Sequence, residues 1–131
     1  MLTLYQWYIS TGLEYAAPVW HAGLTEEQHS RLERVQNRCF RIILGNVYES
    51  YEEALATLWT QKLFHHREAL ILRFGKGLLK DPVHRHLLPP TNYEVHQRRT
   101  RGAERLRTVN ARTRRYKKSA MPYIVEKLNS L

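Results

Sequence analysis

The stretch from Thr25 to Gly45, TEEQHSRLERVQNRCFRIILG, constrains the fold most, because it is a long helical pattern with both ends marked. Thr25 and Gln28 have the spacing of a capping box, in which each side chain bonds the other residue's backbone N–H. Gly45 stands where helices commonly end in a left-handed conformation that glycine adopts without strain. The sequence therefore predicts a central helix against which the other elements pack.

Two faces of this helix carry different residue types. An apolar stripe recurs at spacings of three and four, which at roughly 100° per residue places its members on one side: Leu32, Val35, Cys39, Ile42 and Ile43. On a neighbouring face lies a set that we call the arginine row: Arg31, Arg34, Arg38 and Arg41. The row is either a solvated face whose methylene stems cover the rim of the core, or a surface that binds phosphates through planar guanidinium forks. The helix alone does not decide between them.

Residues 2–20 are rich in apolar and aromatic side chains and predict a first helix, interrupted near Thr11 and Gly12. Pro18 removes a backbone hydrogen bond and predicts a bend or a fresh start. Three tryptophans and several tyrosines of this half of the chain form either an ordinary aromatic core or a surface for a partner: Trp7, Trp20, Trp59, Tyr5, Tyr8 and Tyr15. A partner surface would expose an apolar patch and promote self-association.

Two more helices are predicted after Gly45. Ser50 and Glu53 form a second capping box that opens a short helix ending near Trp59. Thr60 is a plausible cap for a second long helix that ends at Lys80, before Asp81 and Pro82. Its apolar stripe consists of Leu63, Leu70, Ile71, Phe74 and Leu78. Gly75 and Gly77 weaken its last turns, which indicates either fraying or close packing.

The positive charge is concentrated near the C-terminus. The chain has a net charge of +9 and a pI near 10.0, which favours a polyanionic partner. Residues 98–118, which we call the basic segment, hold ten Lys and Arg and the single acidic residue Glu104. Such a run is typical of a mobile, solvated arm. Ser119 and Pro122 suit the start of a terminal helix that packs back on the bundle.

These patterns together predict an all-α fold, a small helical bundle followed by a basic C-terminal arm and a terminal helix. We expect the bundle to span residues 1–88 and the arm with its helix to span residues 89–131. Hydrophobic content of 43% argues against a disordered chain. Strand content should be negligible.

Several kinds of chemistry are not indicated by the sequence. Asp81 is the only aspartate, so the clustered carboxylates of a two-metal phosphoryl-transfer site are missing. Seven histidines with the single cysteine Cys39 make a zinc site a weak prediction, and no phosphate-binding glycine loop or nucleophile elbow occurs. We therefore expect no metal, no cofactor and no catalysis by this chain. Without a signal peptide or an apolar membrane span, we expect an intracellular protein, nuclear or cytoplasmic, and no membrane partner.

Four stretches in order resemble a known family: LEYAAPVWHAGLT, ERVQNRCFRIILG, YEEAL and RYKKSAMPYIVEKLN. They are similar to the C-terminal part, thumb and post-thumb, of non-LTR retrotransposon reverse transcriptases of the jockey-like kind, which are RNA-directed DNA polymerases. The resemblance covers nearly the whole chain. Two departures are His66-Arg67, where the family often has an Arg-Arg pair, and the lack of a cysteine-rich knuckle.

The resemblance implies a thumb-like helical bundle that grips template, primer or element RNA by backbone contacts, without the catalytic palm. The expected partners are RNA, DNA or an RNA–DNA hybrid, and a polymerase palm domain is a further candidate. The alternative is a helical protein-interaction module, or a non-functional remnant that packs against a missing palm or self-associates. The predicted nucleic-acid-binding residues are Arg31, Arg34, Arg38, Arg41, Arg98, Arg99, Arg101, Arg112, Arg114, Arg115, Lys117 and Lys118.

Overall fold

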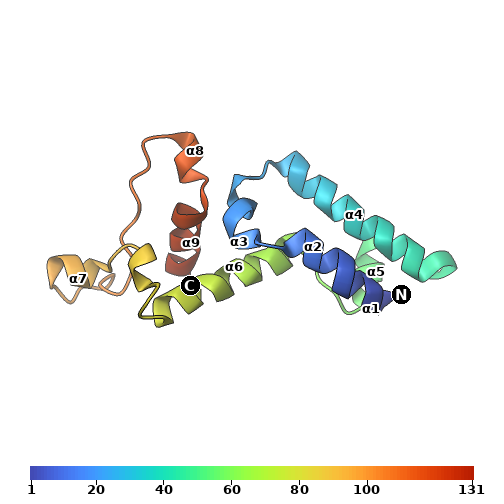
Figure 1. The fold of residues 1–131 in the computed structure, drawn as a ribbon, viewed down its shortest axis with the longest axis horizontal. Helices are drawn as coiled ribbons and strands as arrows, with labels where there is room; N and C mark the ends of the chain where they lie inside the picture. The colour runs from blue at the N-terminus through green and yellow to red at the C-terminus, as the bar shows by residue number, and fades with distance from the viewer. The chain divides into compact units, whose positions relative to one another are not determined.

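A computed structural model describes residues 1–131, and its regular structure is helical throughout, as the sequence predicts (Figure 1). The α-helices are α1 (Leu2–Leu4), α2 (Thr11–Glu14), α3 (Ala17–Trp20), α4 (Glu26–Leu44), α5 (Tyr51–Thr57), α6 (Leu63–Lys80), α7 (Asn92–His96), α8 (Arg114–Lys117) and α9 (Ala120–Asn129). A π-helical stretch (Tyr5–Ser10) joins α1 to α2, and short 3-10 turns occupy His21–Gly23, Gly45–Val47 and Arg85–Leu87. No strand forms; one isolated bridge pairs Thr91 with Leu106.

The chain forms two compact units. Unit 1 comprises residues 1–17 and 24–68, and unit 2 comprises residues 18–23 and 69–131. The division differs from the expected one between residues 88 and 89, because the C-terminal half of α6 contributes Ile71 and Leu78 to the same core as Leu106 and Ile124. The terminal helix and the whole basic segment therefore belong to one unit with the C-terminal half of α6.

The ends of α4 form as the sequence predicts. The Thr25 hydroxyl accepts from the Gln28 backbone N–H at 3.3 Å, and the Gln28 side chain accepts from the Thr25 N–H at 2.9 Å. Gly45 closes the helix with a φ of 55°, and its N–H donates to the Arg41 carbonyl oxygen. Ser50 caps α5 by accepting from the Glu53 N–H at 3.2 Å. The capping box and the glycine end of α4 are confirmed. The predicted box at α5 forms only in part, because the Glu53 side chain does not accept from the Ser50 N–H.

The buried face of α4 differs from the predicted apolar stripe. Phe40 and Gln36 are the buried residues of this helix, whereas Val35 is 42% exposed and Ile42 is 63% exposed. At roughly 100° per residue, Val35 and Ile42 lie about 140° to 160° around the helix from Phe40. Leu32, Cys39 and Ile43 lie between and are partly buried. The prediction was wrong for Val35 and Ile42, because Phe40, on the opposite side of the helix from these two, meets the other helices of unit 1.

The core of unit 1 forms where the π-helical stretch and α5 meet α4. Tyr5 packs edge-on against Phe40, with ring centroids 5.3 Å apart, and Tyr51 stacks on Phe40 from α5 at 6.2 Å. Ala54 and Leu55 complete the buried cluster. Burial raises the pKa of Tyr5 and of Tyr51 above the usual range for a phenol.

Glu33 of α4 connects three elements of unit 1. One carboxylate oxygen accepts from the Tyr51 hydroxyl at 2.5 Å, and the other accepts from the backbone N–H of Phe64 at 2.7 Å. A charged acceptor makes such bonds stronger than neutral ones. The same carboxylate thereby fixes α5 and the first turn of α6 against α4.

Two predicted details of the other helices are wrong. The first helix runs without interruption past Thr11 to Glu14 and breaks at Ala16, whose φ is 52°, so that Pro18 falls in the first turn of α3, where its missing N–H is tolerated. Thr60 does not cap α6, which begins at Leu63. The Thr11 hydroxyl donates to the Trp7 carbonyl oxygen at 2.6 Å, which satisfies this polar side chain within the helix.

In unit 2, α9 packs directly on α6. Ile124 and Val125 of α9 are buried together with Ile71 and Leu78 of α6 and with Leu88. Gly75 lies at the contact, where a Cβ atom would stand only 2.9 Å from the Cγ2 atom of Ile124. Gly75 therefore marks close packing and not fraying. Phe74, predicted to face inward, is instead 46% exposed.

Candidate nucleic-acid interface

The arginine row lies on the surface of unit 1. All four arginines are exposed, and at roughly 100° per residue Arg34 and Arg38 lie about 120° to 160° around α4 from the buried Phe40. The row is therefore on the side of the helix away from the core. Glu33, one position before Arg34, holds α4 to α5 and α6, so the row is carried by a helix that is fixed within its unit.

The two ends of the row are engaged by neighbours, and its centre is not. The Arg31 guanidinium pairs with Glu27 at 2.6 Å, an exposed i,i+4 pair. The Arg41 guanidinium lies 5.1 Å from the ring centre of Tyr48. Arg34 and Arg38 form no ion pair, so their donors face solvent. A phosphate group would meet the least competition at these two residues.

The length of the row suits the repeat of a nucleic-acid strand. At a rise of about 1.5 Å per residue, the ten steps from Arg31 to Arg41 span roughly 15 Å along the helix axis. One strand of duplex DNA carries a charge about every 3.4 Å along its axis, so roughly four phosphates pass over this length. Four guanidinium groups can thus follow one strand without a change in the helix.

The remaining predicted residues lie in unit 2, and all of them are exposed: Arg98, Arg99, Arg101, Arg112, Arg114, Arg115, Lys117 and Lys118. The last four flank or form α8, a single helical turn opened by Thr113, whose hydroxyl accepts from the Tyr116 N–H at 3.2 Å. The predicted cationic residues therefore lie on two separate surfaces, the arginine row of unit 1 and the basic segment of unit 2. No predicted binding residue is buried.

The basic segment is attached to the rest of unit 2 at its middle. The side-chain amide of Asn129 brackets Leu106, accepting from its N–H and donating to its carbonyl oxygen, each at 2.9 Å. Leu106 and Ala103 are buried. The sequence favoured a mobile arm on charge alone, and these contacts place its middle against α9 instead.

A second set of backbone bonds pairs the segment with Pro90 and the first two residues of α7. The Arg107 N–H donates to the Pro90 carbonyl oxygen at 2.9 Å, and the Asn92 N–H donates to the Arg105 carbonyl oxygen at 3.0 Å. The Tyr93 N–H donates to the Ala103 carbonyl oxygen at 2.9 Å. The sequence missed this pairing because it contains no alternating apolar pattern.

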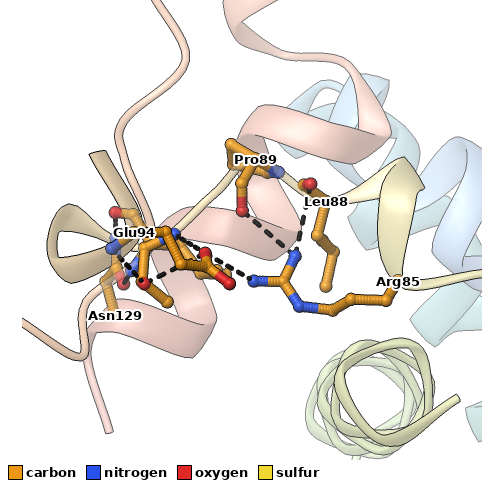
Figure 2. Close-up of polar contacts among 7 residues, drawn as sticks. Arg85, Leu88, Pro89, Glu94 and Asn129 are labelled. Carbon is orange, nitrogen blue, oxygen red and sulfur yellow. Dashed lines mark hydrogen bonds and ion pairs between the residues drawn. The ribbon is translucent and has the colours of Figure 1, made fainter. Parts of the chain in front are cut away.

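The Arg85 side chain binds the chain just before α7 and the first turn of α7 (Figure 2). One guanidinium nitrogen donates to the carbonyl oxygens of Leu88 and Pro89 at 3.3 and 3.2 Å, and another lies 3.5 Å from the Glu94 carboxylate. Glu94 closes a capping box with Thr91, and the bonds it accepts from Thr91 lower the pKa of its carboxyl. Arg85 therefore serves the architecture of unit 2 rather than its basic surface.

Sequence reasoning missed two arginines with different roles. Arg67 of α6 is fully buried, and its guanidinium lies 3.2 Å from the Nδ1 atom of His29. Burial, followed by the charge of Arg67, lowers the pKa of His29. Arg105 lines a surface hollow together with the predicted Arg99 and Arg101. The i+4 spacing of Arg67 from Leu63 and Ile71 is the signal that could have placed it on the buried face.

Unit 1 also exposes apolar and aromatic side chains. Tyr5 is buried, but Trp7, Tyr8, Tyr15 and Trp59 are exposed. Beside Tyr8 lies an apolar hollow of about 210 Å³ lined by residues of the first helix and α4, among them Leu4, Ile9, Ile42 and Ile43. The interpretation of all these aromatic residues as one core is wrong. The first helix buries Tyr5 but exposes Trp7 and Tyr8, and Trp59 lies exposed after the end of α5.

No group of three or more histidine, cysteine or acidic side chains is arranged to hold a metal ion. His66 contacts Glu14, and His84 contacts Asp81 at 2.5 Å, each as an isolated pair.

None of the helices combines the length and the apolar character needed to cross a membrane. Comparison with protein-family models, curated proteins and solved structures found no match.

Proposed function

We propose that this chain binds nucleic acid through contacts to the phosphate backbone, as a thumb-like piece of a non-LTR retrotransposon reverse transcriptase, without catalysis of its own. The partners under this proposal are RNA, DNA or an RNA–DNA hybrid. The observation that carries it is the arginine row, four exposed guanidinium groups on one helix face directed away from the core. The family resemblance of the sequence agrees with it.

We expect the two basic surfaces to contribute differently to nucleic-acid binding. The arginine row needs little ordering on binding, because α4 is already a folded helix. The basic segment has the higher charge density and should supply affinity for every probe. The row should supply register on a duplex or hybrid, since its spacing is fixed.

A salt-titrated binding assay with duplex, hybrid and single-stranded probes tests the proposal. Phosphate-dominated binding weakens steeply as salt rises and discriminates little between sequences. Replacing Arg34, Arg38 and Arg41 by glutamine should lower the salt slope on duplex by roughly 2 to 3 units, at about 0.9 per phosphate contact. Single-stranded probes should be affected less.

A control variant with the same change in net charge shows whether the loss of binding comes from lost phosphate contacts or only from the lower net charge. Arg73, Lys76 and Lys80 are exposed on α6 outside both proposed surfaces, and their replacement by glutamine also removes three positive charges. This variant should keep most of the duplex salt slope. Equal losses in the two triple variants, or binding that does not respond to salt, would refute the proposal.

The second candidate function is protein interaction, which the exposed apolar side chains of unit 1 favour. Under this alternative, Trp7, Tyr8 and Ile42 contact a polymerase palm domain or a second copy of the chain. Light scattering of the purified chain tests it, since self-association at micromolar concentration supports the alternative and a clean monomer weakens it. Replacing Trp7 and Ile42 by serine should then restore the monomer.

A further inference from the structure

Unit 2 contains a basic hollow that the arginine row does not explain. It has a volume of about 980 Å³ and is lined by residues of α7, the basic segment and the end of α9. Small-molecule sites commonly measure about 300 to 1,000 Å³, so the hollow has room for a nucleotide. Its lining includes one aromatic ring, three arginines and one carboxylate: Tyr93, Arg99, Arg101, Arg105 and Glu104.

The ring of Tyr93 is available to a ligand while its backbone is fixed. The Tyr93 side chain is 45% exposed. Its N–H donates to Ala103 at 2.9 Å, and its carbonyl oxygen accepts from the Gln97 N–H at 2.8 Å. An aromatic platform on a fixed backbone loses little freedom when a flat group stacks on it.

The arginines approach the hollow from a chain that turns twice. The Ala103 N–H donates to Thr100 at 3.0 Å, and the Arg105 N–H donates to Gly102 at 3.2 Å. Neither Arg99, Arg101 nor Arg105 forms an ion pair, and Glu104 forms none either. Three positive charges beside one carboxylate suit a ligand whose anionic part is joined to a part that donates hydrogen bonds.

We propose that this hollow binds one unpaired nucleotide of a single-stranded nucleic acid, with its base on the ring of Tyr93 and its phosphates on Arg99, Arg101 and Arg105. Glu104 would repel a phosphate but accepts hydrogen bonds from the N–H groups of a base edge. The inference rests on the proposed function, because it assigns a nucleotide contact to the same chain. It adds a contact to an unpaired base, which phosphate contacts alone do not make.

An unpaired base is required because the faces of bases within a duplex are already stacked on their neighbours. Single-stranded recognition generally combines a basic groove with aromatic rings on which free bases stack. One such stack changes affinity by about fivefold or more. A duplex would contact the rim of the hollow through phosphates alone and would gain nothing from Tyr93.

The test compares three probes that share one 12-base-pair RNA duplex. The first is blunt, the second carries a single-stranded tail of three adenosines, and the third carries a tail of three abasic sites with the same phosphates. The full chain should bind the adenosine tail at least fivefold more tightly than the abasic tail. A DNA version of each tail measures whether the sugar matters. Equal affinity for the adenosine and abasic tails would overturn the proposal.

Substitutions test whether the tighter binding of the adenosine tail, which we call the adenosine gain, comes from the hollow. Tyr93→Leu should remove the adenosine gain and leave blunt-duplex affinity within twofold, and Tyr93→Phe should retain the gain. Tyr116, in the same unit and 47% exposed, lies outside the hollow, so Tyr116→Leu is the matched control and should retain it. If Tyr116→Leu removes the gain as fully as Tyr93→Leu, stacking is not specific to the hollow and the proposal fails.

Two charge variants, one inside the hollow and one outside it, test the phosphate contacts. They also distinguish failure of this inference from failure of the proposed function. Arg101→Gln should weaken the tailed probe more than the blunt one. Arg112→Gln removes the same charge from the basic segment outside the hollow and should weaken both equally. If blunt duplex binds with steep salt dependence but the tail adds nothing, only the hollow is refuted. If no probe binds in a salt-dependent way, the proposed function itself fails.

Discussion

Replacing Gly75 by alanine tests whether α9 packs on α6 as closely as the structure indicates. An added Cβ atom would stand 2.9 Å from the Cγ2 atom of Ile124 and 3.3 Å from two side-chain atoms of Leu128. Carbon atoms prefer separations of about 3.5 to 4.0 Å. Ile124 is buried and β-branched, so its Cγ2 methyl cannot rotate away freely. The two helices must therefore separate by several tenths of an ångström.

The size of the effect is the balance of two terms. Overpacking a core costs about 1 to 3 kcal/mol, while alanine gains up to about 1 kcal/mol over glycine within a helix. With an overpacking cost near the middle of its range, about 2 kcal/mol, Gly75→Ala should destabilise unit 2 by roughly 1 to 2 kcal/mol. Gly77 provides the matched control in the same helix, because nothing lies within 4 Å of its added Cβ. Gly77→Ala should stabilise by about 0.4 to 1 kcal/mol.

Urea unfolding followed by tryptophan fluorescence measures both variants. Trp20 is the single tryptophan of unit 2, and the exposed Trp7 and Trp59 of unit 1 can be replaced by phenylalanine so that the signal reports unit 2 alone. The two alanine variants should move the midpoint in opposite directions. If Gly75→Ala stabilises as much as Gly77→Ala, the close helix contact does not exist and the packing argument is refuted.

Three further predictions concern hydrogen bonds and one titrating group. Tyr51→Phe removes the 2.5 Å bond to the Glu33 carboxylate and should lower the free energy of unfolding of unit 1 by about 1.5 to 3 kcal/mol in urea titrations. Asn129→Ala leaves both backbone groups of Leu106 without their partner and should speed amide exchange around Leu106 at least tenfold, with no change in unit 1. The pKa of His29 is lowered in the folded chain, so the unfolded chain binds the proton more readily. Unit 1 should therefore lose stability as the pH falls from 7 to 5, through the ordinary histidine pKa, and His29→Gln should flatten that dependence in urea midpoints.

Helix ends were predictable from the sequence because their determinants are local. Thr25 with Gln28 and Ser50 with Glu53 are three residues apart, and the Thr25 and Ser50 side chains accept the predicted capping bonds. Gly45 ends α4 because only a residue without a side chain adopts the required backbone conformation at no cost. The exposure of the arginine row also followed from sequence, since guanidinium groups are rarely buried.

The faces that become buried depended on the other helices. Phe40 is buried and Ile42 is exposed because Tyr5 and Tyr51 meet α4 on the side of Phe40, and no residue of α4 itself encodes where those partners lie. Arg67 shows the same dependence, because its position on the inner face of α6 outweighs its charge and His29 of α4 provides a contact. Periodicity gives the width of a stripe but not the direction from which a partner helix approaches.

The basic segment was decided by tertiary structure for a similar reason. Its charge predicts a mobile arm, and nothing within residues 98–118 signals a fixed position. Asn129 fixes Leu106 from 23 positions away, and the hollow beside Tyr93 exists only because this bond and the pairing of Tyr93 with Ala103 hold the segment in place. The sequence by itself determined which residues are basic, where α4 and α5 begin and where α4 ends. Contacts between residues distant in the chain determined which of those charges surround a hollow, because such contacts depend on how the helices pack.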